Sequence, residues 1–171
     1  VAPAAVVARA QVRADRADRR KRLELKTRAS GSAFLFSSFL FSPFCCRSTA
    51  ERLWSSAGVG PRDVDLPQVY DGFSPFVWLW LEALGFCPTG EAHRFVLDGS
   101  IDSDDPTALP ALSGGGALGN GRLHGVPQVL ECYLQLARRA GDRQRPGVEV
   151  GVACHASPHL GGAVVTTVDA G

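Results

Sequence analysis

The order of apolar patterns after residue 48 constrains the fold of this chain more than any other feature of its sequence. Apolar residues recur at helical spacing in three segments, and short apolar runs typical of strands stand between and after them. The expected helices are 49–57, 73–84 and 126–140, and the expected strands are 64–71, 95–99, 148–154 and 163–168. This mixture predicts an α/β domain in which helices pack on a sheet.

The expected helix 73–84 is apolar on nearly every side. Ser74-Pro75 suits a helix start and Gly85 suits its end. A helix of this kind is either buried on most faces or lies at an interface. We therefore expect homodimerisation, or packing of this helix against a second half-domain.

Charge divides the chain near residue 47. Residues 1–47 carry ten Arg or Lys and three Asp or Glu, whereas residues 48–171 carry eight and fourteen. A division of this kind marks a tail joined to a folded unit. We expect residues 1–47 to be a mostly disordered or partly helical basic tail, with a basic helix over residues 9–28 as the alternative. Nucleic-acid binding is not expected, because no aromatic residues are interleaved with the basic ones.

The only long apolar stretch of the tail, residues 33–46, is interrupted by Ser and Pro. A membrane-spanning helix needs about 20 apolar residues, so no span is expected; a signal peptide is the alternative. The five Cys form no CxxC and their number is odd, which favours free thiols in a reducing, cytoplasmic compartment. The Cys and His residues show no metal-ligand spacing, so no metal site is expected.

Four stretches carry a family resemblance. They are Ala57–Asp65 (AGVGPRDVD), Tyr70–Phe73 (YDGF), the pair Ser113-Gly114-Gly115 and Gly121–Gly125 (GRLHG), and Glu131 to Gln144. Their order resembles that of the C-terminal half of the thiolase superfamily. The resemblance implies a thiolase-like fold for residues 48–171, a C-terminal half-domain with a mixed sheet packed by helices.

The branch of the superfamily depends on two positions. Thiolases have a His at the position of Arg122 in this chain. Sterol-carrier thiolases also have a His at the position of Tyr70. YDGF with GRLHG instead resembles the lipid-transfer-type, or sterol-carrier thiolase-like, aldolases. This resemblance implies retro-aldol C–C cleavage of a lipid or steroid acyl-CoA.

The resemblance also implies site residues. Tyr70 matches a tyrosine of the aldolases, His124 matches the His of their second motif, and Arg122 replaces a second Tyr. A phenol is a poor base at neutral pH, so Tyr70 needs a cation nearby. Arg122 is that cation, or it holds the thioester oxygen. Asp71 either orients these side chains or caps the helix that follows it.

Two further groups belong to the predicted site. Cys154 stands where thiolases place their second, acid/base Cys; a buried structural thiol is the alternative. Ser113, Gly114 and Gly115 are expected to line the cleft and contact the substrate's CoA, with a flexible loop as the alternative. No Lys-Ser/Thr follows this glycine run, which argues against nucleotide triphosphate binding.

The implied substrate is an acyl-CoA, with coenzyme A as part of it and no other cofactor bound. A partner with an OB-fold and a zinc site is implied by the same resemblance. Two alternative functions stay open: an acyl-CoA acyltransferase or thiolase, and a non-catalytic, truncated thiolase-like fragment. The absence of an initial Met favours a fragment.

Overall fold

The structure, a computed structural model, describes residues 35–38, 43–105, 107–156 and 160–168. These residues belong to one compact unit that spans residues 32–168. The predictions for residues 1–34, including the partly helical segment 9–28, lie outside the described residues. No helix of the described part is long and apolar enough to cross a membrane.

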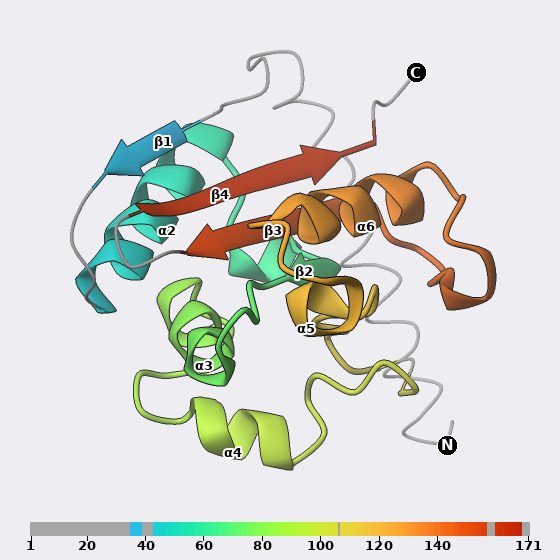
Figure 1. Cartoon of the computed structure of the whole chain (residues 1–171), viewed down its shortest axis with the longest axis horizontal. Helices are drawn as coiled ribbons and strands as arrows, with labels where there is room; N and C mark the ends of the chain where they lie inside the picture. Colours follow the sequence, from blue (N-terminus) through green and yellow to red (C-terminus); the bar gives the residue numbers. More distant parts are fainter. Residues whose placement is uncertain (1–34, 39–42, 106, 157–159, 169–171) are drawn as a thin grey trace, which may run out of the picture. The chain divides into compact units, whose positions relative to one another are not determined.

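Four strands form one mixed sheet in the order β1-β4-β3-β2 (Figure 1). They are β1 (Leu35–Ser38), β2 (Leu66–Gln68), β3 (Val150–Ala156) and β4 (Leu160–Thr167). β4 pairs antiparallel with β1 and β3, whereas β2 pairs parallel with β3. The predicted α/β architecture with a mixed sheet is therefore confirmed.

Five helices accompany the sheet in the described residues. They are α2 (Pro43–Ala57), α3 (Ser74–Ala83), α4 (Ala92–Leu97), α5 (Gly116–Asn120) and α6 (Val126–Leu136). Two 3-10 turns, Pro61–Asp63 and Gly141–Arg143, complete the elements. The helix expected from residue 49 thus begins earlier, at Pro43, and β1 also lies within the range expected to be a tail.

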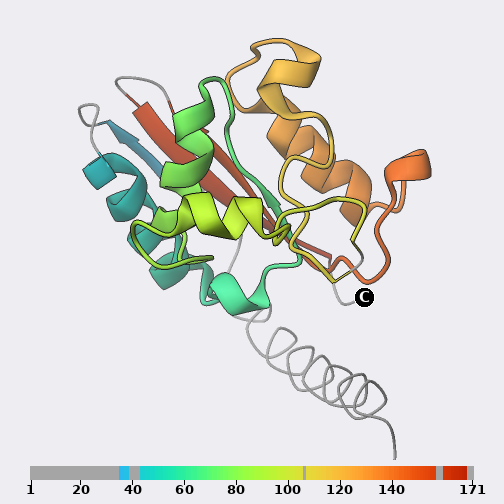
Figure 2. The same ribbon diagram turned by 90° about the horizontal axis from the view of Figure 1, so that it is seen from below.

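α2 and α6 lie on opposite faces of the sheet (Figure 2). Alternate residues of a strand point to opposite faces, so β3 must be apolar on both. Val150, Val152, Ala153 and Cys154 are all at most 2% exposed, as a strand covered on both sides requires. This double cover explains why the sequence of β3 is a continuous apolar run.

The strand expected at residues 95–99 is wrong, because these residues lie mainly in α4. Phe95-Val96-Leu97 is too short to fix a period of two or of 3.6 residues. The helix is set by its surroundings instead: the Ala92 amide donates to Glu82 Oε1 at 3.2 Å, and Arg94 pairs with Glu91 one turn earlier. Leu97 is 84% exposed, so this segment does not enter the core.

Two other predicted boundaries differ from the structure. The helix expected over 126–140 ends at Leu136, since Arg138 adopts a left-handed backbone with φ of 59°. The long loop 100–121 contains α5, a short helix whose start is stabilised by a distant carboxylate, as described below.

The apolar helix α3 is buried on one side only. Phe76, Trp80 and Leu81 are buried, whereas Trp78 is 49% exposed and the preceding Phe73 is 53% exposed. Its remaining apolar surface faces outward within the described residues.

Candidate functional site

Tyr70 follows β2 and is almost fully buried, at 2% exposure. Its ring lies edge-on to the ring of His155, with centroids 5.1 Å apart, and 6.0 Å from the ring of Phe76. A Cβ at Gly72 would lie 2.2 Å from the Tyr70 hydroxyl, so only glycine fits there. The hydroxyl is therefore held against the backbone of Gly72.

Arg122, in the GRLHG motif of residues 121–125, contacts the same glycine. Its Nη2 donates to the Gly72 carbonyl oxygen at 3.2 Å, and its Cζ lies 4.8 Å from the centre of the Phe73 ring. The aromatic face attracts the guanidinium, which fixes its position without neutralising its charge. The Tyr70 hydroxyl and the Arg122 cation thus meet at Gly72.

Asp71 is buried, and its carboxylate is occupied by structural contacts. Its oxygens accept hydrogen bonds from the amides of Ala117 at 2.5 Å and Leu118 at 3.1 Å, and from Gln128 Nε2 at 3.2 Å. A Cβ at Gly116 would lie 2.3 Å from the same carboxylate. Asp71 therefore caps α5, a different helix from α3, which follows it in sequence and for which the cap was expected.

His124 and His155 complete the cluster. The His124 backbone is left-handed, with φ of 47°, and its exposed ring lies 5.8 Å from that of His155. Gly125 has φ of 94°, and a Cβ there would lie 2.8 Å from the His155 Cβ. Burial, and to a smaller extent the neighbouring His124, lowers the pKa of His155 below its ordinary value of 6.5. His155 is thus neutral at neutral pH.

An apolar groove opens beside the two histidines. It has a volume of about 620 Å³ and runs between α6 and the end of the β3–β4 pair. Its apolar side chains include Val126, Val129, Leu130, Tyr133, Ala163 and Val164. The first four are each at least 44% exposed, so this face of α6 is open in the described part of the chain. The two histidines bring polar groups to one wall of this groove.

Cys154 also borders the groove, but its side chain is only 1% exposed. Burial raises the pKa of the Cys154 thiol well above its ordinary value, and nearby Cys46 and Cys132 add to this rise. Burial likewise raises the pKa of Cys132 to about 12. These thiols therefore stay protonated, as in a structural core. No group of three or more potential metal ligands occurs among the described His, Cys, Asp and Glu side chains.

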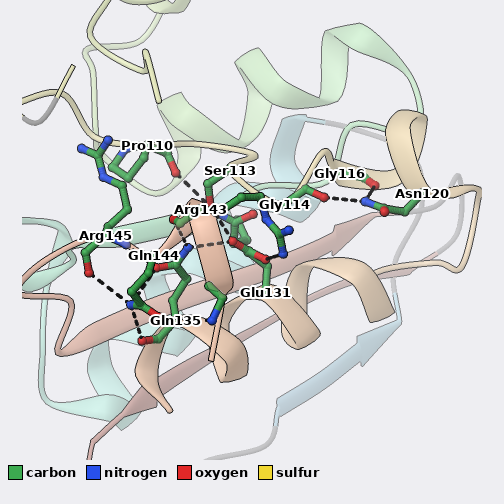
Figure 3. Close-up of polar contacts among 12 residues, drawn as sticks. Pro110, Ser113, Gly114, Gly116, Asn120, Glu131, Gln135, Arg143, Gln144 and Arg145 are labelled. Atoms are coloured by element: carbon green, nitrogen blue, oxygen red, sulfur yellow. Dashed lines mark hydrogen bonds and ion pairs between the residues drawn. The ribbon is translucent and has the colours of Figure 1, made fainter. Parts of the chain in front are cut away.

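The residues expected to contact CoA join the long loop to the rest of the domain (Figure 3). Ser113 Oγ donates to Glu131 Oε1 at 3.1 Å and accepts from Gln68 Nε2 at 3.1 Å. A Cβ at Gly114 would lie 2.9 Å from Glu131, and Gly115 takes a left-handed backbone, with φ of 85°, at the start of α5. These contacts give Ser113, Gly114 and Gly115 structural roles in the described part of the chain.

Glu131 is the centre of a larger polar network (Figure 3). Its carboxylate accepts from Gln135 Nε2 at 2.9 Å and pairs with Arg143 at 3.0 Å. The side chain of Gln135 in turn accepts from the Arg145 amide at 2.9 Å and from Gln144 Nε2 at 3.2 Å. The Glu131–Gln144 stretch is thus a structural clamp between α6 and the turn after it.

His155 is the site residue that the sequence did not single out for proton transfer. Its sequence neighbourhood offers Cys154 with His155 or His159, a weak signal of a Cys/His nucleophile pair. The buried, protonated Cys154 thiol does not support that pair. The position of His155 at the end of a strand, facing two separate loops, is visible only in three dimensions.

Known proteins resemble the chain in sequence and in fold. An 85-residue stretch is 41% identical to a 17-hydroxy-3-oxo-4-pregnene-20-carboxyl-CoA lyase from Mycobacterium tuberculosis, covering 50% of this chain and 22% of that protein. A 97-residue stretch is 37% identical to a steroid side-chain-cleaving aldolase from Thermomonospora curvata, covering 57% and 24%. A 125-residue stretch is 34% identical to rat sterol carrier protein 2, covering 71% and 22%.

A solved structure described as Ltp2-ChsH2(DUF35) aldolase matches with a TM-score of 0.63 and 27% identity, over 71% of this chain and 31% of that one. The chain thus spans about a quarter or less of the length of these curated relatives. The family model described as thiolase C-terminal domain-like matches residues 37–168. The chain therefore belongs to the thiolase C-terminal domain-like family.

Proposed function

We propose that this chain forms part of an enzyme that cleaves a C–C bond in a lipid or steroid β-hydroxyacyl-CoA by a retro-aldol reaction. The observation that carries the proposal is the meeting of two loops at Gly72, where the Tyr70 hydroxyl and the Arg122 guanidinium converge. The names of the lyase and the aldolase to which the chain is similar support the same reaction.

Retro-aldol cleavage needs two kinds of group. One accepts the proton of the substrate's β-hydroxyl, and another stabilises the negative charge that develops on the thioester oxygen. Arg122 supplies a permanent positive charge for that oxygen, and the Tyr70 hydroxyl supplies a hydrogen-bond donor beside it. The long apolar groove suits the carbon skeleton of a lipid or steroid acyl group. Coenzyme A enters as part of the substrate.

Acyl transfer of the thiolase type is less well supported. That chemistry needs a second acid/base Cys and an imidazole at the position of Arg122. The Cys154 thiol is buried and stays protonated, and a guanidinium does not exchange protons at neutral pH. These features favour the lyase over the acyltransferase.

We also propose that the enzyme is a homodimer that places the outward apolar surface of α3, with Phe73 and Trp78, against a second copy. Residues of this size dominate the energy of protein interfaces. A separate OB-fold partner with a zinc site is proposed from the aldolase resemblance, and the name of the similar solved aldolase, Ltp2-ChsH2(DUF35), contains two components. The free thiols of the described Cys residues favour a cytoplasmic location.

Direct product analysis tests the proposed reaction. The assembled enzyme that contains this chain is mixed with a β-hydroxyacyl-CoA, and mass spectrometry measures release of a ketone or aldehyde together with the shortened acyl-CoA. We expect Tyr70→Phe and Arg122→Gln each to lower the rate about 100-fold or more. Arg94→Gln, on the exposed surface of α4, is the matched control and should leave the rate unchanged.

Three results would contradict the proposal. Exchange of acyl groups with free coenzyme A, without release of a carbonyl product, would indicate a transferase. An assembled enzyme that contains the wild-type chain and is inactive would indicate that the chain is a non-catalytic thiolase-like fragment. Full activity in Tyr70→Phe and Arg122→Gln would remove both residues from the mechanism.

A further inference from the structure

We propose that His155 is a further catalytic residue of this site, and that its imidazole accepts the proton of the substrate's β-hydroxyl group. The inference rests on the proposed retro-aldol function and adds the missing proton acceptor to it. It starts from the position of His155, which contacts Tyr70 of the YDGF motif and His124 of the GRLHG motif and borders the groove.

His155 lies at the junction of three parts of the site. Its ring contacts the Tyr70 ring at 5.1 Å and the His124 ring at 5.8 Å, and its side chain also lines the apolar groove. Gly125 lets the backbone of the second loop approach, because a Cβ there would lie 2.8 Å from the His155 Cβ. A substrate that fills the groove therefore lies against this imidazole, whose other side contacts the Tyr70 ring.

The other titratable side chains of the site are poor proton acceptors. The Asp71 carboxylate already accepts three hydrogen bonds from α5 and α6. Cys154 stays protonated, and Arg122 is a permanent cation. His124 is exposed to water, outside the burial that a proton acceptor needs to work on a bound substrate. His155 is the half-buried imidazole that remains.

The surroundings of His155 favour its neutral, proton-accepting form. Its ring is half-buried, which disfavours the charged form, and its Nδ1 is enclosed with no hydrogen-bond partner among the described residues. The titratable groups that face it are Tyr70, His124 and, across the groove, Tyr133, and none of these is an anion that would stabilise the cation. Because Nδ1 is enclosed, Nε2 is the nitrogen that accepts the substrate's proton, and the neutral ring carries its own hydrogen on Nδ1.

The proposed step balances in atoms and charge. The β-hydroxyl proton moves to His155 as the O–H electrons form the C=O bond of the ketone or aldehyde. The Cα–Cβ bond breaks, and its electron pair becomes the thioester enolate, whose oxygen lies near Arg122. The imidazolium then returns the proton to the enolate carbon, which gives the shortened acyl-CoA and restores neutral His155. No oxidant, reductant or metal is required.

Chemical rescue separates proton transfer from a structural role. His155→Ala should lower the cleavage rate about 100-fold or more, as loss of a general base does. Added imidazole should restore part of the rate, and the restored rate should follow the concentration of unprotonated imidazole as pH changes. His93→Ala, in the exposed part of α4, is the matched control and should show neither effect. His155→Asn, close in size to histidine, keeps the site packed and should be as slow as His155→Ala.

Two outcomes would overturn the role of His155 while leaving the lyase function standing. One is a wild-type rate in His155→Asn, and the other is a slow His155→Ala enzyme that imidazole does not rescue at any pH. NMR of the His155 ring gives a readout that is independent of turnover. A β-hydroxyacyl-CoA should shift its Nε2 signal in the wild-type chain, and an unchanged signal with bound thioester would also exclude the proposal. A wild-type assembled enzyme that binds thioester but releases no carbonyl product would instead refute the lyase function.

Discussion

At the scale of single residues, close approach to backbone decides the geometry of the site. Gly72, Gly116 and Gly125 each occupy a position where a Cβ would lie less than 3 Å from a site side chain: Tyr70, Asp71 and His155, respectively. Such contacts are closer than real side chains tolerate, so these glycines fix the neighbouring groups. The lack of a side chain at these three glycines therefore determines the positions of Tyr70, Asp71 and His155.

Gly125→Ala tests this arrangement. The variant should cost about 1–2 kcal/mol from its left-handed backbone alone, and more because its Cβ meets His155. Gly99→Ala is the control: Gly99 follows the C-terminal end of α4 with φ of 84°, and no atom lies within 4 Å of an added Cβ. Thermal unfolding should show the greater loss for Gly125→Ala. An equal loss of thermal stability in the two variants would mean that the contact between the added Cβ and His155 does not destabilise the fold.

At the scale of elements, the polar clamp around Glu131 connects α6, the turn after it and the long loop. Glu131 is 3% exposed and Gln135 is fully buried, so their hydrogen bonds replace contacts with water that both lost on folding. Ser113 and Arg143 attach the two flanking segments to this centre. The clamp thereby holds the C-terminal half of α6, whose N-terminal end carries the groove.

Glu131→Gln should lower the free energy of unfolding by about 1–3 kcal/mol, because it leaves a buried network partly unsatisfied. The Arg143 side chain is 51% exposed, so solvent screens its ion pair and most of the loss should come from the buried hydrogen bonds. Glu91→Gln breaks the exposed pair with Arg94 and should change stability little. Urea denaturation of both variants measures the difference. A Glu131→Gln chain as stable as Glu91→Gln would contradict the clamp.

At the scale of the whole molecule, stability should depend on pH through His155. Its pKa in the folded chain lies below the ordinary value of 6.5, so the unfolded chain binds more protons between these two values. The free energy of unfolding should therefore hold its full value above about pH 6.5 and fall as pH drops through the folded-state pKa. Removing the imidazole removes this contribution.

Chemical denaturation at a series of pH values measures this effect. The difference in stability between wild type and His155→Asn should change through the window below pH 6.5 and stay constant above it. His93→Asn, which removes an exposed imidazole from α4, should follow the wild-type curve. A constant difference between wild type and His155→Asn at every pH would mean that His155 has the same pKa in both states.

Much of the fold was predictable because its information is local. Apolar periodicity located α3, the start of α6 and the β3–β4 pair, and the order of the YDGF and GRLHG motifs predicted a thiolase-like half-domain with a mixed sheet. Tyr70, Arg122 and His124 were found in the same way, since each stands inside a short motif. Their roles in catalysis stay predictions.

Contacts between distant segments decided the rest. Glu82 accepts a hydrogen bond from the Ala92 amide at the start of α4, which contains residues 95–97, and Asp71 became the cap of a helix 46 positions away. His155 gained its place when β3 brought it against Tyr70 and His124, which no local pattern encodes. A short apolar run does not show whether it forms a helix or a strand. An isolated polar residue does not show which distant residue it will contact. The sequence by itself therefore determined the family and its main elements, and only tertiary packing decided which polar groups are free to meet a substrate.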